Sequence, residues 1–255
     1  VFAPLYSGGY FTNHNLIKHG VQIYDIGRNI GRFAFPVFCF LLVEGFFHTR
    51  SKKKYGIRLF VFALISQIPF TYLLAGKLWY DKFNMLFTLL FCFMILLCLE
   101  KIENRFLRII CAFFFACLCT YCDWGMVAPL WVIVFAIFRE DKKKMCIFYS
   151  LVCIYWVVRC ISLTVGDGGL WYSVLWQTGS LGFIPLIYLY NGENGKVTKF
   201  TKWFFYWFYP VHLLIIAVIY KDILQLLAMA AQKKNLKEST PLIALFHAFT
   251  SSRYI

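Results

Sequence analysis

Ionisable side chains interrupt a strongly apolar stretch near the start of the chain. Residues 27–58 carry Arg32 near one end of a segment of membrane-spanning length, with Glu44 and His48 near the other. An ionised group at bilayer depth costs on the order of 3 kcal/mol, so such groups face a bundle interior, a partner or a ligand. Glu44 and His48 share a helical face, and Arg58 begins the next apolar segment. The stretch predicts either a functional site or a Glu44–Arg58 ion pair that joins two helices.

The composition excludes a soluble globular domain. Hydrophobic residues make up 61% of the 255 residues and charged residues 15%, whereas soluble domains average about 45–50% apolar and 25% charged. The sequence predicts an all-α, polytopic integral membrane bundle with about eight transmembrane helices in one domain. The apolar segments of roughly bilayer-crossing length are 30–47, 57–75, 84–99, 106–120, 123–138, 145–163, 170–190 and 203–220.

The net charge of +14 comes from Lys and Arg that gather in alternate turns. This pattern indicates a multi-pass membrane protein rather than a nucleic-acid partner, because cytoplasmic loops are enriched in Lys and Arg. The basic tail after Tyr220 does not fit the pattern, and an interfacial helix at 223–231 is one interpretation of it. We expect four turns to be cytoplasmic: 50–55, 100–105, 139–144 and 191–202.

The start of the sequence indicates a further helix. Residue 1 is Val, and residues 1–26 contain no apolar span of their own. Because the predicted topology places this stretch outside, we expect one more helix before it. The sequence then divides into an outer loop (1–26), a transmembrane domain (27–220) and a C-terminal tail (221–255).

The ten cysteines do not predict a metal or redox centre. Cys119 and Cys122 have the two-residue gap of a zinc or redox pair, but a zinc site needs further ligands nearby. Most of the other cysteines lie in apolar runs, where a thiol packs as a small hydrophobic group. We expect no metal.

Six sequence blocks resemble the TraX family in order and spacing, and they cover residues 27 to about 216. The blocks are IGRFAFPVFCFLLVEGFFHTR, KKYGIRLFVFALISQIPF, NMLFTLL, CDWG, LYNGENGK and FYPVHLLI. The resemblance implies a polytopic inner-membrane protein that acetylates the amino terminus of an F-type pilin during conjugation, or one that assists fimbrial assembly. RFAFPVFCFLLVEGF and YPVHLLI also look like stretches of the acyltransferase-three membrane family. The family's Asp-His pair would lie just before Val1.

On the predicted topology, the block residues fall into two layers. The outer layer comprises Arg32, Asn84, Thr88, Asp123, Trp124, Gln177 and His212. The inner layer includes Glu44, His48, Arg50, Arg58, Tyr190 and Lys196. The resemblance implies acetyl-CoA as a cytoplasmic donor, and basic groups bind phosphate oxygens through charge-assisted hydrogen bonds. The predicted acetyl-CoA-binding residues are therefore His48, Arg50, Arg58 and Lys196, although the topology alone also requires basic turns.

Acyl transfer needs a base and a donor for the developing oxyanion. His212 is the predicted base, and the alternative is a neutral histidine bonded within the bundle. Arg32 either stabilises the oxyanion or pairs with Asp123, the third catalytic candidate. The predicted substrate-lining residues are Asn84, Trp124, Gln177 and Glu44, with a helix N-cap as the alternative for Asn84.

The sequence therefore predicts a membrane-embedded acyltransferase. It would move an acetyl group from acetyl-CoA to a pilin-like amine or a cell-surface glycan hydroxyl. Two alternatives remain open. A transporter would use the buried Arg, Glu and His residues as a relay, and a non-catalytic pilus or conjugation assembly factor would use them as ties between helices.

Overall fold

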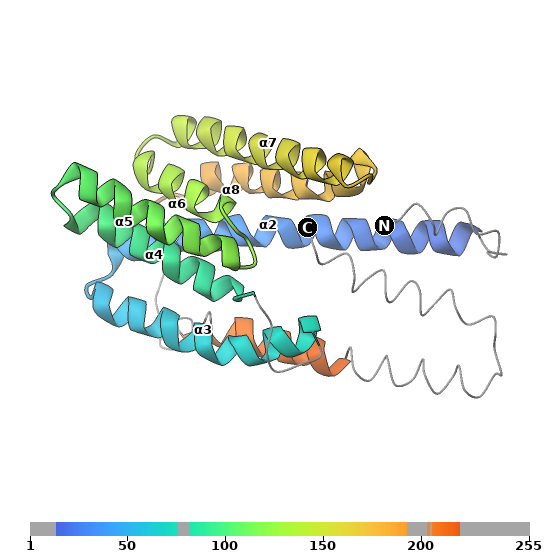
Figure 1. Ribbon diagram of the computed structural model, residues 1–255, viewed down its shortest axis with the longest axis horizontal. Coiled ribbons are helices and arrows are strands. Elements are labelled where there is room, and N and C mark those ends of the chain that lie inside the picture. Colours follow the sequence, from blue (N-terminus) through green and yellow to red (C-terminus); the bar gives the residue numbers. More distant parts are fainter. Residues whose placement is uncertain (1–13, 76–81, 193–202, 205, 220–255) are drawn as a thin grey trace. The chain divides into compact units, whose positions relative to one another are not determined.

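The computed structural model describes residues 14–75, 82–192, 203–204 and 206–219 (Figure 1). Within these residues every regular element is a helix. The only β-type pairing among them is an isolated bridge between Phe83 and Cys122. The prediction of an all-α chain is confirmed.

The chain divides into two compact units. The first unit comprises Val1–Lys52, Phe91–Thr120 and Trp124–Glu193, and the second comprises Lys53–Leu90, Tyr121–Asp123 and Asn194–Ile255. The division separates the candidate residues: Arg32, Glu44 and Gln177 belong to the first unit, whereas Arg58, Asn84 and His212 belong to the second.

Helices of both α and 3₁₀ type build the first unit. Helix α2 packs against η2 and α6, and α7 packs against α6, η2 and α8. Helix α4 begins in the second unit and ends in the first. The elements are α2 (His14–His48), α4 (Met85–Lys101), α5 (Arg105–Leu118), η1 (Cys119–Tyr121), α6 (Val127–Ile137), α7 (Lys142–Gly166), η2 (Trp171–Phe183) and α8 (Ile184–Leu189).

Buried aromatic rings form the core of this unit. The ring of Phe40 on α2 lies 5.6 Å from the rings of both Phe135 on α6 and Phe183 on η2. Phe135 also stacks at 5.3 Å on Tyr149 of α7. Aromatic pairs at these separations add to the free energy gained from burial. The cluster therefore fixes α2, which carries Arg32 and Glu44, against the three elements around it.

The segment predicted as one span at 170–190 is mostly a 3₁₀ helix. Element η2 runs for 13 residues, although such helices rarely exceed three or four residues. A 3₁₀ helix has three residues per turn, and buried side chains recur at every third position: Val174, Gln177, Ser180 and Phe183. Trp176 is also buried. The spacing of the buried residues thus follows the 3₁₀ period.

The second unit contains α3 (Lys52–Ala75), the start of α4 and the helix Tyr206–Ile219. The ring of Phe62 on α3 lies 5.1 Å from Tyr206 and 5.2 Å from Trp207. Aromatic packing therefore joins α3 to the helix that carries His212.

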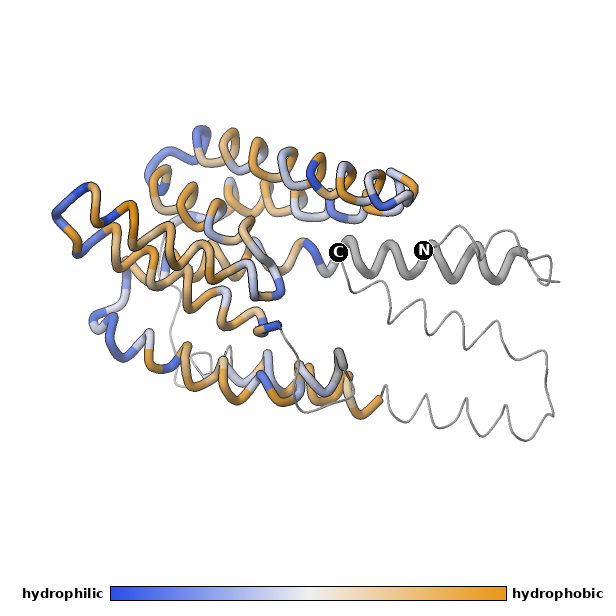
Figure 2. The backbone as a smooth tube through the Cα atoms, viewed as in Figure 1, coloured by the Kyte–Doolittle hydropathy of each residue, from blue (hydrophilic) through white to orange (hydrophobic). Residues whose placement is uncertain are grey.

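Two helices among the described residues pass a length and composition test for a membrane span. Gly31–His48 and Lys142–Gly166 are long and apolar enough to cross a membrane, and Val127–Ile137 and Tyr206–Ile219 are shorter apolar helices. No residue of α5 is buried. Figure 2 shows hydrophilic residues in the α4–α5 and α6–α7 turns and mainly hydrophobic residues along the helices between. The count of eight spans stays a prediction.

Candidate functional site

Glu44 lies at the centre of a polar cluster at the C-terminal end of α2. Its Oε1 accepts a hydrogen bond from Arg139 Nε at 2.7 Å. Its Oε2 accepts from Arg139 Nη2 at 3.1 Å and from the Tyr190 hydroxyl at 3.0 Å. His48 Nδ1 lies 2.9 Å from the Glu44 backbone oxygen and 3.5 Å from Oε2. Glu44, a residue only 7% exposed, therefore joins α2 through its carboxylate to the α6–α7 turn and to the end of α8.

The structure gives Glu44 a partner other than the predicted Arg58. Arg139 binds both carboxylate oxygens, a fork geometry that is stronger and more directional than a single contact. Hydrogen bonding to Glu44 raises the pKa of the Arg139 guanidinium above its ordinary value. Arg58 belongs to the second unit, where its Nε donates to the Tyr206 hydroxyl at 3.2 Å. The guanidinium of Arg58 also lies 5.9 Å from the ring of Tyr55.

In the sequence, Arg139 is one of the basic residues that mark the predicted cytoplasmic turn 139–144. Its turn contains several basic residues, and nothing in their spacing distinguishes the one that reaches a carboxylate on another helix. Neighbouring Lys142 donates to the backbone oxygens of Tyr190 and Tyr188, the latter at 3.4 Å. Lys142 therefore holds the end of α8 beside the same cluster.

The predicted acetyl-CoA-binding residues are distributed over both units. His48 is exposed at the end of α2, and Arg50 is exposed in the turn that follows. Arg58 is half-buried against Tyr206. Lys196 lies outside the described residues. The structure brings His48 beside Glu44 and leaves the proposed binding roles as predictions.

Arg32 contacts two tryptophans of the first unit. Its guanidinium carbon lies 4.4 Å from the centroid of Trp124, in the turn before α6, and 4.4 Å from that of Trp176 on η2. Separations below about 6 Å are those of cation–π contacts. Trp124 is one of the predicted substrate-lining residues. Trp176 was not predicted, because composition does not distinguish it among eight tryptophans.

Asp123, the third catalytic candidate, is an exposed residue of the second unit. Its backbone N–H donates to the Phe83 oxygen at 3.0 Å. This bond lies next to the isolated bridge of Cys122. The structure thus fixes the backbone of Asp123 and leaves its catalytic role a prediction.

Asn84 occupies the N-terminus of α4. Its Oδ1 accepts from the Leu86 N–H at 2.9 Å, which is the bond of a helix N-cap. Its Nδ2 donates to the Ala63 oxygen at 2.7 Å and to Gln67 Oε1 at 2.9 Å. Asn84 is fully buried. The structure therefore supports the capping alternative, in which Asn84 joins α4 to α3.

Gln177, another predicted substrate-lining residue, is 1% exposed on η2. The indole N–H of Trp156 donates to its Oε1 at 3.4 Å. Gln177 is therefore part of the contact between α7 and η2, directly beside Trp176 in the sequence.

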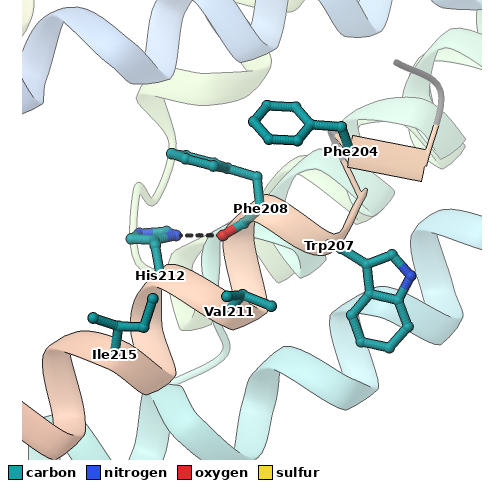
Figure 3. Close-up of a pocket in the computed structure, with 6 residues that line it drawn as sticks. All are labelled: Phe204, Trp207, Phe208, Val211, His212 and Ile215. Carbon is teal, nitrogen blue, oxygen red and sulfur yellow. Dashed lines mark hydrogen bonds between the residues drawn. The ribbon is translucent and has the colours of Figure 1, made fainter. Parts of the chain in front are cut away.

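His212 lies in an apolar groove on the helix Tyr206–Ile219 (Figure 3). Its Nδ1 is 2.9 Å from the Phe208 oxygen, and its ring stacks on Phe208 at 5.1 Å. A neutral imidazole that donates through Nδ1 carries its lone pair on Nε2, so Nε2 is the acceptor of this tautomer. The groove has a volume of about 220 Å³ and is lined by Phe204, Trp207, Phe208, Val211, His212 and Ile215.

The cysteines are all free thiols. Cys119 and Cys122 are buried, at 0% and 3% exposure. Among the described residues, no group of three or more His, Cys, Asp or Glu side chains is placed to hold a metal ion.

Comparison with known proteins identifies the family. The family model described as TraX protein matches residues 13–220. A probable fimbrial assembly protein, FimC of serogroup H1 from Dichelobacter nodosus, is 31% identical over 143 residues, which cover 53% of this chain and 59% of that relative. No solved structure matches the chain, and the resemblance to the acyltransferase-three family stays a prediction. Because the family model matches well over half of the sequence, the chain belongs to the TraX family.

Proposed function

We propose that this TraX protein is a multi-pass protein of the inner membrane that transfers an acetyl group from acetyl-CoA during pilus assembly or conjugation. The family match and the relative named as a probable fimbrial assembly protein support the setting. The proposed acceptor is a pilin-like amine or a cell-surface glycan hydroxyl.

Helix lengths and exposed apolar side chains support several membrane crossings. The 17 residues of α4 extend about 25 Å at 1.5 Å per residue, and the 13 residues of η2 extend about 26 Å at 2.0 Å per residue. Both lengths approach the roughly 30 Å of a bilayer core. On α5, Phe106 and Phe113 are 75% and 64% exposed, and lipid is the environment in which such a surface is stable.

The turns of the first unit support the proposed topology. Figure 1 shows the α4–α5 and α6–α7 turns toward one end of this unit and the α7–η2 turn toward the other. Basic residues lie in or at the helix ends beside the first two turns (Lys101, Arg105, Arg139, Lys142, Lys143 and Lys144), whereas residues 166–170 contain none. Lys and Arg favour the cytoplasmic side, so the first two turns are proposed to be cytoplasmic and the third external.

The tautomer of His212 carries the chemical part of the proposal. A general base must present an unprotonated nitrogen to the attacking group, and Nε2 is that nitrogen when Nδ1 donates to Phe208. The acceptor nitrogen or oxygen attacks the thioester carbonyl carbon while its proton passes to Nε2. The tetrahedral intermediate then collapses, the carbon–sulfur bond breaks, and coenzyme A leaves as a thiolate that takes up the proton from Nε2, which restores the neutral imidazole.

Three further sets of residues keep their predicted roles in the proposal. An oxyanion-stabilising role for Arg32, in the first unit, and a catalytic role for Asp123, in the second, stay predictions from the family resemblance. The phosphates of acetyl-CoA are bound by His48, Arg50, Arg58 and Lys196. No metal takes part in the proposed reaction.

Acetyl transfer from labelled acetyl-CoA tests this proposal. Membrane vesicles that contain the protein should transfer label to a membrane-associated acceptor, which mass spectrometry then identifies. Vesicles without the protein are the control, and a Lys144→Gln variant controls for changes at an exposed turn. Equal labelling with and without the protein would contradict the proposed acetyltransferase activity.

A non-catalytic assembly factor is the second candidate. The observation that favours it is the Glu44 cluster, in which the carboxylate is saturated by Arg139 and Tyr190 and serves as a tie between helices. An assembly factor would be required for pilus assembly while transferring no label. A transporter would instead produce an ion flux in liposomes.

A further inference from the structure

We infer that Trp124 and Trp176 are positioning residues that form a preformed slot for the planar guanidinium of Arg32. The inference rests on the proposed function, in which Arg32 stabilises an oxyanion, and it assigns a role to Trp176 that the sequence does not indicate. The two tryptophans act through Arg32 rather than by touching the reacting atoms.

Both indoles approach the guanidinium equally closely. The Cζ atom of Arg32 lies 4.4 Å from each ring centroid, and all three residues belong to the first unit. A guanidinium stacks through its flat faces and donates hydrogen bonds in its own plane, so one group can use both kinds of contact. The indoles therefore restrict the plane in which the N–H fork of Arg32 points.

The ring of Trp124 is fixed by contacts that do not involve Arg32. It stacks on Phe35 with 4.1 Å between centroids and 10° between planes, and it lies 5.9 Å from Trp131. Both Phe35 and Trp131 are buried at 1% exposure or less. Gly125, the next residue, has a φ of +52°, a conformation that glycine adopts without a steric penalty. This turn directs the chain into α6 and leaves Trp124 against α2.

The ring of Trp176 has its own anchor. Its indole N–H donates to the Ser173 oxygen at 2.9 Å, and the side chain is 8% exposed. Ser173 lies three residues before Trp176, which is one turn of a 3₁₀ helix, so its backbone oxygen is within reach of the indole. Because both rings are held by the protein, the slot should persist when the side chain of Arg32 is removed.

Lysine at position 32 would place a charge in the slot without the planar fork. An ammonium group also makes cation–π contacts, but it acts as a point charge and does not give a fixed pair of parallel hydrogen bonds. The slot therefore selects arginine for shape as well as for charge.

Chemical rescue of an Arg32→Ala variant tests the slot. Methylguanidinium at low millimolar concentration should bind between the two indoles and change their fluorescence in a saturable way. Arg32→Ala/Trp176→Leu should lose this saturable change, and urea, which is planar but uncharged, should not produce it in Arg32→Ala. A response that is identical in the single and double variants would overturn the inference.

The fluorescence titration does not depend on catalysis, so it distinguishes failure of the slot from failure of the proposed function. If the protein transfers acetyl groups, methylguanidinium should also restore part of the activity that Arg32→Ala loses. That loss is expected to be about a hundredfold, as for removal of an oxyanion donor. A saturable fluorescence change without any acetyl transfer by the unmodified protein would support the slot between the indoles and contradict the proposed acetyltransferase activity.

Variants that keep Arg32 provide a second measurement. Trp176→Leu should lower kcat by about tenfold while the KM for acetyl-CoA changes less than about twofold, because it misorients a group that acts in the transition state. Trp176→Phe keeps an aromatic face and should recover most of kcat. Equal loss in Trp176→Leu and Trp176→Phe at matched thermal stability would contradict a positioning role.

Discussion

The pair of Glu44 and Arg139 should respond asymmetrically to removal of either partner. The Glu44 side chain is 9% exposed, whereas that of Arg139 is 32% exposed. Arg139→Met strands a nearly buried carboxylate, and breaking a buried pair in this way costs about 3–5 kcal/mol. Because solvent reaches the Arg139 side of the pair, we expect about 3 kcal/mol, the lower end of that range.

Glu44→Gln should cost less, about 1–2 kcal/mol, because the partly exposed guanidinium that it leaves unpaired is still hydrated. The amide of Gln also keeps one acceptor oxygen for Arg139. The double variant Glu44→Gln/Arg139→Met removes both charges and should cost less than the sum of the two single changes, with a coupling of about 1–2 kcal/mol.

Unfolding of the purified protein in detergent by SDS titration measures these free energies. The matched control is the exposed pair of Lys144 and Asp141, with side chains 64% and 43% exposed and 3.1 Å apart. Exposed pairs typically couple by less than about 1 kcal/mol. If the Glu44 and Arg139 changes add within about 0.5 kcal/mol, the carboxylate does not depend on Arg139 and the reasoning fails.

Three further predictions follow, two from contacts in the structure and one from the proposed topology. Asn84→Ala removes a cap and leaves buried acceptors unpaired, so it should destabilise the protein by about 2–4 kcal/mol in thermal melts, whereas Asn84→Asp should keep the cap bond. The backbone N–H of Lys144 binds the carboxyl of Asp141 and lowers its pKa. The stability that this contact contributes is therefore present at neutral pH and lost as the pH falls through the lowered pKa. Asp141→Ala should remove this part of the acid dependence of the melting temperature. In a background without native cysteines, Lys143→Cys should be labelled only from the cytoplasmic side and Asp167→Cys only from outside, and the reverse pattern would overturn the topology.

The sequence predicted that Glu44 needs a partner, because a carboxylate at this depth is costly when unpaired. The partner that it predicted was Arg58, and the structure places Arg139 on the carboxylate. Arg58 begins the apolar segment that follows the first basic turn, whereas Arg139 is 95 residues away from Glu44. Choosing between them requires the packing of α2 against α6, which depends on aromatic contacts such as that of Phe40 with Phe135 rather than on the spacing of charges.

Element η2 shows a second limit of sequence pattern. Its apolar length predicts a span, but the 3.6-residue and three-residue periods are difficult to distinguish where nearly every position is apolar. The three-residue period places Gln177 inside and sets the register of Trp176, which contacts Arg32. By contrast, the sequence predicts either a substrate-lining residue or a helix N-cap at Asn84, and the bond to the Leu86 N–H supports the cap.

The decisive measurement for His212 as the general base is the rate of acetyl transfer by a His212→Gln variant. Gln can still donate to the Phe208 oxygen but has no titratable nitrogen, so the variant should reach normal levels in the membrane. Loss of a general base commonly lowers rates about a hundredfold or more. At matched protein levels, we expect at least this loss of label transfer from acetyl-CoA, and transfer close to that of the unmodified protein would contradict a general-base role for His212.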